Sequence, residues 1–505
     1  MSETTEEKPN TKYRTYVLIV LTIVYMFNFI DRQIIGILSP FIKADLGLTD
    51  AQLGFLKGFA FALFYTIMGI PIAWLADRFN RVTIVSVSLA LWSAFTAASG
   101  VAANYTQLAL ARVGVGVGEA GGSPPSHSMI SDFYSKEERA GALAIYSLGI
   151  PFGIMMAYFA SAFLLGGGLG ENTGGWRTVM ILLGIPGVLF ALIVKLTIKE
   201  PVRAKAPSSG TEAKVNLSSP FVLIAAVSFV SVVIGLVFSI LYWAPISSIQ
   251  LGFMSLPGWM SLIGTLTLIF SLYQLVFVQD FYPPVKTLLS IPSWWGMCMG
   301  IAWVSFATYA VGAWGIDYVS RAFPDADLIR FLVIFGIING TTYAGGTWFG
   351  GYLTDKMGKK DKGAYAFVPA VGVLIAIPVL VYSMWTGSLV IHVACIAVFL
   401  FVLGFYLGPS FSVAQTLAPV NVRAMSTALF FFILNIIALG GGPTFVGLMS
   451  DALLQVNGDE TQSLRIAMTF LAVPMVISLI AFYWTSKKLP EDWIKAEERN
   501  RDGAS

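Results

Sequence analysis

Long apolar runs, each able to cross a lipid bilayer, recur along almost the whole chain and limit the folds open to it. A helix needs about 20 apolar residues to span the hydrocarbon core. Such runs predict fourteen helices, near residues 15–39, 52–76, 82–102, 106–128, 140–166, 176–198, 220–244, 257–279, 293–318, 328–353, 364–385, 388–416, 424–450 and 464–486. Only 12% of the 505 residues are charged, so the chain cannot cover a water-facing surface. We therefore predict an all-α integral membrane protein.

The distribution of lysine and arginine predicts which side of the membrane each loop faces. Clusters of basic residues occur at Arg78 and Arg81, Lys136 and Arg139, Lys199 to Lys214, Lys356 to Lys362, and Lys487 with Lys488. The intervening loops hold few basic residues, and cytoplasmic loops carry the excess in membrane proteins. We expect a multi-pass plasma membrane protein, in the inner membrane of a bacterium, with both termini in the cytoplasm.

The first six and the last six predicted helices repeat one another. The stretch AWLADRFNR (Ala73 to Arg81) resembles GYLTDKMGKK (Gly351 to Lys360), and each ends an apolar helix with Leu, Asp and several cations. The stretches that begin at Glu138 and at Val422 both open a helix with Arg and small residues. Parallel repeats of this kind build transporters whose substrate site lies between the halves.

The repeat divides the chain into six parts. We predict a cytoplasmic tail (1–14), an N-terminal six-helix half (15–198), a cytoplasmic linker (199–219), an inserted two-helix hairpin with its connector (220–285), a C-terminal six-helix half (286–486) and a second cytoplasmic tail (487–505). The function of the inserted hairpin does not follow from its sequence.

The two repeated loops resemble the signature loop of the major facilitator superfamily, of the type G-x-L-A-D-R-x-G-R-K. The second copy is nearly complete, with Gly351, Leu353, Asp355, Lys356, Gly358, Lys359 and Lys360. The first copy departs at Ala73 and Asn80, where that family usually has Gly, and keeps Asp77, Arg78 and Arg81. The resemblance implies the major facilitator fold, with two six-helix halves related by a pseudo-two-fold axis.

A narrower resemblance lies in the first, fourth and fifth predicted helices. YMFNFIDRQIIGILSP is similar to the Y-x-x-N-x-x-D-R start of the spinster branch of that superfamily. ARVGVGVGEAGGSPPSHSMISDFYSKEERAGALAIYSLGIPFG resembles its fourth and fifth helices, including the R-x-x-G-x-G-E-A run and the G-I-P-x-G turn. The resemblance implies transport of lysophospholipids or sphingoid lipid phosphates, with a proton gradient implicated for some members.

Four ionisable residues stand in the middle of predicted membrane helices: Asp31, Arg32, Arg112 and Glu119. Each costs roughly 2.5–3.5 kcal/mol on insertion scales, so each needs a partner or a function. Asp31 and Arg32 point about 100° apart, so their best partners lie on other helices. Arg112 and Glu119 share one helix stripe, while Gly114, Gly118 and Gly122 form another face suited to close helix packing. We predict a polar cluster; ion pairs that only fix helix register are the alternative.

This cluster predicts a mechanism for a coupled transporter. Arg32 and Arg112 can hold a phosphate or carboxylate through paired hydrogen bonds. Asn28 and Tyr25 lie on the stripe of Arg32 and are predicted to contact the same substrate. Asp31 and Glu119 are predicted to carry the proton, because an acid whose arginine is taken by an anion binds a proton more readily.

The C-terminal half is expected to hold no comparable central charge. Its helices offer aromatic and amide side chains, and we predict substrate contacts from Tyr309, Trp314 and Asn339. Charges on one wall and aromatic residues on the other favour an amphipathic lipid, although packing in the core is the simpler explanation. We expect Lys57, near a helix end, to extend its ammonium group toward the membrane surface.

The repeated loops are predicted to serve gating at the cytoplasmic side. The predicted gating residues are Asp77, Arg78, Arg81, Arg139, Asp355, Lys356 and Arg423, with Arg139 and Arg423 as natural partners of the two aspartates. Simple anchoring by positive charge is an equally good explanation for Arg81.

The predicted function is a proton-coupled secondary active transporter of lysophospholipids or related amphipathic lipid phosphates. A proton symporter of a small soluble organic acid, and a lipid sensor that does not transport, are the alternatives. We expect no enzyme activity, cofactor, metal or nucleic-acid partner, since the sequence holds two histidines and lacks metal-ligand spacing or a nucleophile with a base. We expect a monomer whose partners are the substrate, protons and membrane lipid.

Overall fold

The computed structural model describes residues 11–135, 138–168, 175–201, 254–278, 283–419 and 422–502. It also describes residues 221, 224–225, 227–229, 231–232, 235 and 250–251. The predicted linker beyond residue 201 and much of the predicted helix 220–244 lie outside these residues.

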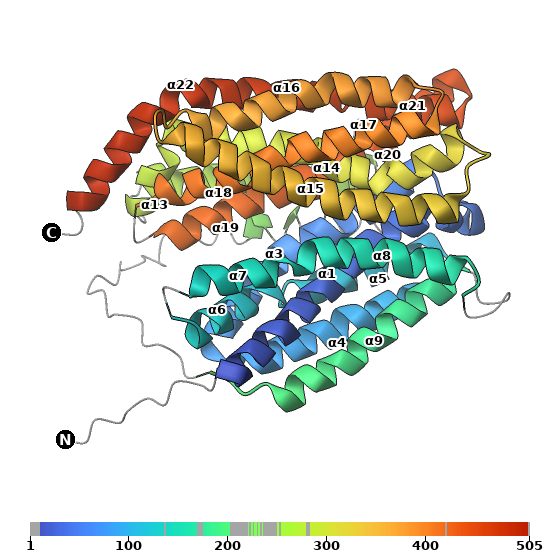
Figure 1. The fold of residues 1–505 in the computed structure, drawn as a ribbon, viewed down its shortest axis with the longest axis horizontal. Coiled ribbons are helices and arrows are strands. Elements are labelled where there is room, and N and C mark those ends of the chain that lie inside the picture. The colour runs from blue at the N-terminus through green and yellow to red at the C-terminus, as the bar shows by residue number, and fades with distance from the viewer. Residues whose placement is uncertain are drawn as a thin grey trace.

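The N-terminal half is a helical bundle, drawn in blue to green in Figure 1. Its elements are α1 (Thr11–Leu46), α2 (Asp50–Lys57), α3 (Phe59–Arg78), α4 (Arg81–Ser99), α5 (Tyr105–Glu119), α6 (Ser123–Phe133), α7 (Arg139–Ser147), α8 (Gly149–Leu165) and α9 (Trp176–Thr197).

The C-terminal half is a second helical bundle, in yellow to red, beside the first (Figure 1). Its elements are α14 (Pro292–Ala322), α15 (Leu328–Gly358), α16 (Ala364–Trp385), α17 (Leu389–Leu403), the short turn η2 (Gly404–Tyr406), α18 (Leu407–Thr416), α19 (Arg423–Leu434), the π-helical turn η4 (Asn435–Gly440), α20 (Gly441–Asn457), α21 (Glu460–Thr469) and α22 (Ala472–Asp502). Both chain ends lie at the same end of the two bundles.

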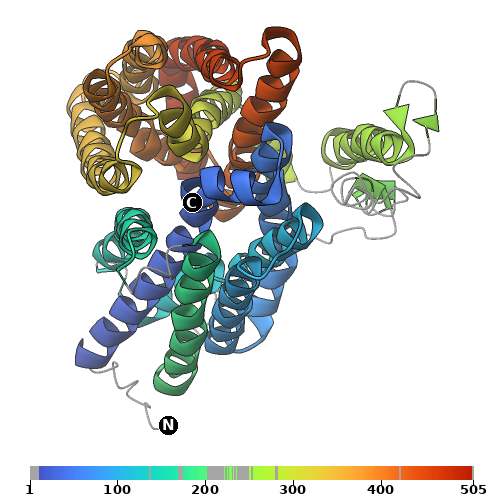
Figure 2. The ribbon, with the colours of Figure 1, turned by 90° about the vertical axis from the view of Figure 1, so that its right-hand side faces the viewer.

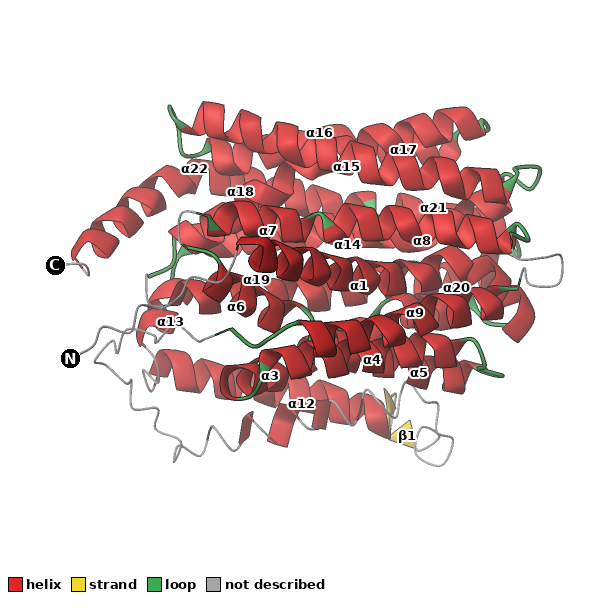
Figure 3. Cartoon of the chain, turned by 60° about the horizontal axis from the view of Figure 1, so that its bottom comes forward, coloured by secondary structure: helices red, strands yellow, loops and turns green. Residues whose placement is uncertain are grey.

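The inserted segment joins the two halves in sequence, and its strands and long helix stand to one side of both bundles in Figure 2 and at the lower edge in Figure 3. It contains the strands β1 (Gln250–Leu251) and β2 (Met254–Ser255), which pair antiparallel, then α12 (Leu256–Tyr273), η1 (Gln274–Val278) and α13 (Pro283–Leu289). The Ser228 hydroxyl lies 2.7 Å from that of Thr267 in α12, so the two arms of the insertion contact each other.

Several of the predicted membrane helices are interrupted where the predictions had them continuous, and two of these breaks lie next to the residues discussed below. The helix predicted at 52–76 breaks at Gly58, whose φ of −112° and ψ of −99° are not helical. Glycine is required there because a Cβ would lie 2.4 Å from the backbone oxygen of Gly440. The helix predicted at 106–128 ends at Glu119 and resumes at Ser123, where prolines 124 and 125 occupy the first turn of α6. Pattern alone could not place the first break, since it depends on a segment about 380 residues away in sequence, whereas the two prolines mark the second break locally.

Twelve helices of the described residues are long and apolar enough to cross a membrane. The prediction of an all-α, multi-pass membrane fold with two helical halves is confirmed. The larger of two buried apolar cores contains residues of both halves, the smaller lies almost wholly in the N-terminal half, and the side chain of Tyr309 packs against both.

The halves meet closely at the end of the molecule opposite the chain termini. There α2 packs on α20, the end of α1 on α14, and α8 on the start of α15. We name this region, formed by residues 39–57, 314–321 and 440–460, the junction end.

Candidate functional site

The predicted polar cluster exists, and it joins α1 to α5 inside the N-terminal half. The Nε of Arg32 donates to Oε2 of Glu119 at 2.7 Å, and Nδ2 of Asn28 donates to the same oxygen at 2.8 Å. Glu119 is fully buried, whereas the Arg32 side chain is 14% exposed. The acid is therefore shielded from solvent, whereas part of the arginine side chain is accessible to it.

Asp31 and Arg112 form the second part of this cluster. Nη1 of Arg112 donates to the backbone oxygen of Asp31 at 3.2 Å rather than to its carboxylate. Both residues are at most 2% exposed. Within the described part of the chain, several buried atoms of the cluster have no hydrogen-bond partner: Arg32 Nη2, Arg112 Nε, Glu119 Oε1, Asp31 Oδ1 and Asn28 Oδ1. Buried polar atoms are normally satisfied, so these unpaired donors and acceptors require an explanation, and binding of a polar ligand would supply one.

Aromatic side chains of α3 surround the arginines, and the sequence analysis missed them. The guanidinium carbon of Arg32 lies 4.5 Å from the ring centre of Tyr65 and 5.2 Å from that of Phe61. The guanidinium of Arg112 lies 5.4 Å from the Phe61 ring. Phe61 and Tyr65 are four residues apart and therefore share one helix face. Nothing in the apolar run of α3 distinguishes that face from the others.

Glycines allow α5 to approach its neighbours closely enough to build the cluster. A Cβ on Gly118 would lie 2.7 Å from the backbone nitrogen of Trp92 in α4. A Cβ on Gly116 would lie 2.6 Å from the backbone oxygen of Phe61 in α3. The predicted close packing is confirmed for Gly114 and Gly118, which lie against α4, whereas Gly116 belongs to a different face and lies against α3. These contacts fix the position of Arg112 and Glu119 against α3 and α4.

The other predicted substrate residues are less directly connected to the cluster. The ring of Tyr25 stacks on that of Tyr146, with centroids 4.4 Å apart. Tyr309 of α14 packs against both cores, and Asn339 is half-buried on α15. Trp314 lies elsewhere, at the junction end, where its Nε1 donates to the backbone oxygen of Pro443 at 2.8 Å.

The expectation for Lys57 is wrong. Lys57 does not extend to the membrane surface: it is buried, and its Nζ lies 2.6 Å from Oδ2 of Asp317 and 3.6 Å from the ring centre of Trp314. Asp317 is fully buried near the end of α14, so it is not a central charge of the C-terminal half. The error has a physical cause: α2 packs on α20 and its last residue contacts α14, so this helix end does not reach the lipid surface.

The predicted gating residues lie at the end that carries the termini. Arg81 is 2% exposed and bonds to Asp132 at 2.5 Å and to Glu200 at 2.7 Å, so it does more than anchor the loop. Arg139 donates to the backbone oxygen of Ser131 at 2.8 Å.

In the second loop, Asp355 accepts a hydrogen bond of 3.4 Å from Tyr365. Lys356 lies 5.9 Å from the ring centre of Tyr352, and Arg423 is exposed at the start of α19. Asp77 and Arg78 lie in the last turn of α3, and the side chain of Asp77 is not among the described ones. The predicted arginine partners of Asp77 and Asp355 stay a prediction.

Known proteins resemble this chain, two of them over most of its length. The crystal structure of a bacterial homologue of the human lysosomal transporter Spinster, in an inward-facing and unoccupied conformation, is 28% identical. It superposes with a TM-score of 0.76 and covers 96% of this chain and 99% of its own. An MFS-type efflux pump of Mycolicibacterium smegmatis is 27% identical over 94% of this chain and 93% of its own length. A probable galactarate/D-glucarate transporter of Bacillus subtilis is 29% identical over 38% of this chain and 42% of its own.

The family model of the Major Facilitator Superfamily matches residues 21–345. That match spans the N-terminal half, the insertion and the start of the C-terminal half, including both parts of the polar cluster. The chain is therefore a member of the Major Facilitator Superfamily and resembles its spinster transporters.

Proposed function

We propose that this protein is a proton-coupled secondary active transporter that moves lysophospholipids or related amphipathic lipid phosphates by alternating access. The observation that carries the proposal is the buried cluster of two acids and two arginines with unpaired donors and acceptors. We further propose that both termini lie in the cytoplasm, which makes the junction end the external side and the present conformation inward-facing.

Arg32 and Arg112 bind the anionic headgroup in this proposal. Nη2 of Arg32 and Nε of Arg112 are buried donors without partners in the described structure. A phosphate has several acceptor oxygens and can satisfy both donors at once. Phe61 and Tyr65 hold the guanidinium planes, since Arg stacks on aromatic faces.

Glu119 and Asp31 carry the proton. Glu119 relies on Arg32 and Asn28 for its stabilisation, and both donors meet the same carboxylate oxygen. When a phosphate takes Arg32, the buried carboxylate loses its cation and is then stabilised by binding a proton. Substrate binding and proton binding are thereby linked through one arginine.

The acyl chain lies toward the C-terminal half in this proposal. Tyr309 of α14 is partly buried between the two cores, and Asn339 and Tyr343 of α15 are half-buried. An apolar wall with few polar groups suits a lipid chain better than a sugar. Contact between a substrate and Trp314 would require the junction end to open, because Lys57 covers its ring.

The test is uptake of radiolabelled lysophosphatidylcholine into proteoliposomes, with and without an imposed pH gradient. The variants are Asp31→Asn, Arg32→Ala and Glu119→Gln, and the control is Lys495→Ala, which removes an exposed charge of α22. We expect gradient-driven uptake in the wild type and the control and loss of it in the three cluster variants. Uptake that persists in all three would show that the cluster only stabilises the fold.

A second candidate is proton symport of a small soluble acid. The similarity to a probable galactarate/D-glucarate transporter favours it, because two arginines can also hold a carboxylate. Competition by short anions without an acyl chain would support this candidate, whereas affinity that rises with chain length supports the lipid. Lipid binding without any uptake would indicate a sensor.

A further inference from the structure

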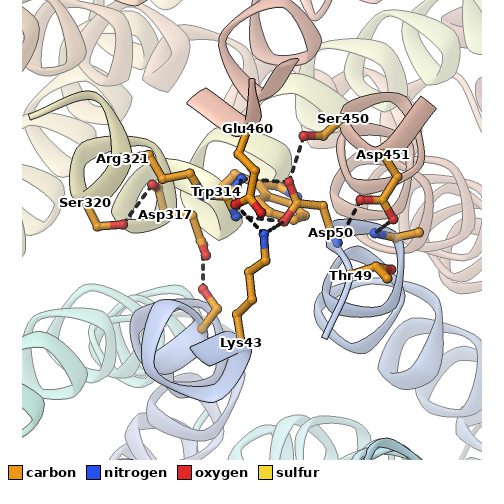
Figure 4. A network of polar contacts seen from close by, with 12 residues as sticks. Lys43, Thr49, Asp50, Trp314, Asp317, Ser320, Arg321, Ser450, Asp451 and Glu460 are labelled. Atoms are coloured by element: carbon orange, nitrogen blue, oxygen red, sulfur yellow. Dashed lines mark hydrogen bonds and ion pairs between the residues drawn. The ribbon is translucent and has the colours of Figure 1, made fainter. Parts of the chain in front are cut away.

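The first turn of α2 is capped by a residue of the other half. The Asp50 N–H donates to Oδ1 of Asp451 at 3.0 Å, and the Ala51 N–H donates to Oδ2 at 2.9 Å (Figure 4). The first amides of a helix have no acceptor inside the helix and need one from elsewhere. Here that acceptor is a carboxylate on α20, 401 residues away in sequence from Asp50.

A second layer of contacts surrounds the carboxylate of Asp50. Arg321 of α14 donates to both of its oxygens at 2.7 Å, and the Ser450 hydroxyl donates at 2.7 Å. Lys43 lies 3.0 Å from the same carboxylate and 2.8 Å from Glu460 of α21 (Figure 4). Asp50 is 3% exposed, so these contacts are shielded from water.

Close backbone packing makes this arrangement dependent on the relative position of the halves. A Cβ on Gly54 would lie 2.7 Å from the backbone oxygen of Pro443 and 3.1 Å from Cα of Gly447. The helices α2 and α20 are therefore in direct backbone contact below the cap. A hydrogen bond is lost once donor and acceptor are more than about 3.5 Å apart, so a separation of roughly 1 Å breaks both bonds to Asp451.

The start of α2 does not depend wholly on the other half. Oγ1 of Thr49 accepts from the Gln52 N–H at 3.2 Å, and Oε1 of Gln52 accepts from the Thr49 N–H at 3.0 Å. This local capping box keeps the helix start in place when the halves separate. Only the amides of Asp50 and Ala51 then lose their acceptors.

We propose that Asp451 is a gating residue that caps α2 across the two halves and holds the junction end closed. This inference rests on the proposed alternating access, since it assigns the contact that must break when this end opens. Opening exposes the amides of Asp50 and Ala51 to water and leaves Asp50 without Arg321. The conformation with the junction end closed is therefore the stable one in the absence of substrate.

The chain offers a matched control at the same end of the molecule. Oδ1 of Asp459 accepts from the Thr461 N–H at 2.7 Å and the Gln462 N–H at 3.0 Å, and so caps α21 within its own half. Asp459 and Asp451 perform the same local chemistry. Of these two caps, only the one from Asp451 joins the halves, so of the two losses only that of Asp451 is expected to change their separation.

The experiment measures the separation at the junction end directly. Cys298 and Cys395 are replaced by Ala, and spin labels are attached to Val101→Cys and Val456→Cys, which are 71% and 82% exposed and lie on opposite halves. The distance between the two spin labels is measured by double electron–electron resonance in nanodiscs without substrate. Hydrogen exchange of residues 47–57 is followed in parallel by mass spectrometry.

We expect Asp451→Ala to shift the population toward longer distances between the labels. We also expect hydrogen exchange of the first α2 amides to become roughly fivefold faster, which is the effect expected from loss of one helix cap. Asp459→Ala is expected to leave both readouts at wild-type values. Ala51→Pro, which removes one donor at a position where helices accept proline, gives a smaller shift in the same direction and serves if Asp451→Ala does not fold. Unchanged distances in Asp451→Ala and Ala51→Pro, or equal shifts in Asp451→Ala and Asp459→Ala, would overturn the inference.

Neither readout requires substrate or a proton gradient. Loss of uptake in the cluster variants with no effect of Asp451→Ala on the distances would therefore overturn the gate and leave the transport proposal intact. The reverse result would refute the transport proposal and retain the contact.

Discussion

The ion pair between Lys57 and Asp317 gives a prediction whose size follows from burial. The Nζ–Oδ2 distance is 2.6 Å, the two side chains are 1% and 0% exposed, and the pair joins α2 of one half to α14 of the other. Removal of one partner leaves an uncompensated buried charge, which costs about 3–5 kcal/mol. We expect Lys57→Met to lower the free energy of unfolding by this amount.

Two neighbouring side chains reduce the loss of stability when Asp317, rather than Lys57, is replaced. In Asp317→Asn the ammonium of Lys57 keeps the Trp314 ring at 3.6 Å, and a desolvated cation–π contact contributes about 2 kcal/mol. The Ser39 hydroxyl, 2.5 Å from Asp317 Oδ2, can still bond to an amide oxygen. We therefore expect Asp317→Asn to cost less than Lys57→Met.

The control is an exposed pair with the same geometry. Lys495 and Glu491 also lie 2.6 Å apart, but their side chains are 64% and 56% exposed and water screens the attraction. Unfolding of each variant is followed by tryptophan fluorescence in mixed micelles. We expect Lys495→Met to change the free energy of unfolding little. We expect the double variant Lys57→Met with Asp317→Leu to lower it by much less than the sum of the two single variants. Equal costs for Lys57→Met and Lys495→Met would refute the argument from burial.

Three further predictions follow from single contacts. Hydrogen bonds from Arg14 at 2.6 and 2.7 Å hold the pKa of Glu138 below its ordinary value. Their contribution to stability is therefore present above the pKa that Glu138 has in the unfolded chain and is lost as the pH falls through the lower pKa of the folded protein. We expect the melting temperature of Glu138→Gln to depend less on pH than that of the wild type between about pH 6 and 3. Gly54→Val should force α2 away from Pro443, cost about 1–3 kcal/mol and lengthen the distance between labels at the junction end, and an unchanged distance would contradict the close contact. Arg32→Lys keeps the charge but loses the fork of donors, so we expect its affinity for lysolipid to fall at least about tenfold in a binding titration, while wild-type affinity would exclude paired hydrogen bonds to the headgroup.

Much of the polar cluster could be predicted because helix periodicity and the cost of a charge in lipid can both be read from short stretches of sequence. Arg112 and Glu119 share one stripe of α5, and a charge in a membrane helix requires a partner, so a cluster with Asp31 and Arg32 could be predicted. Which acid pairs with which arginine could not, and the structure pairs Arg32 with Glu119. The glycine face of α5 was predictable for the same reason, since helix periodicity is fixed. The roles of these residues in substrate and proton binding remain predictions.

The aromatic side chains around Arg32 were not predictable. Phe61 and Tyr65 lie in a uniformly apolar run, and periodicity does not show which face of α3 points to α1. The junction end was hidden for a different reason. Lys57, Asp317, Asp50 and Asp451 each resemble ordinary charges near helix ends, and their contacts cross 260 to 401 residues of sequence.

The sequence by itself determined the membrane fold, the repeated halves and the presence of a charged centre. These properties follow from the length of apolar runs and from the cost of each charge in lipid, and both act residue by residue. The tertiary structure alone decided where Gly58 breaks a helix, which charges pair between the halves and which carboxylate caps α2. Those outcomes depend on contacts between the halves, such as Gly54 against Pro443, which join residues far apart in sequence and which no local pattern encodes.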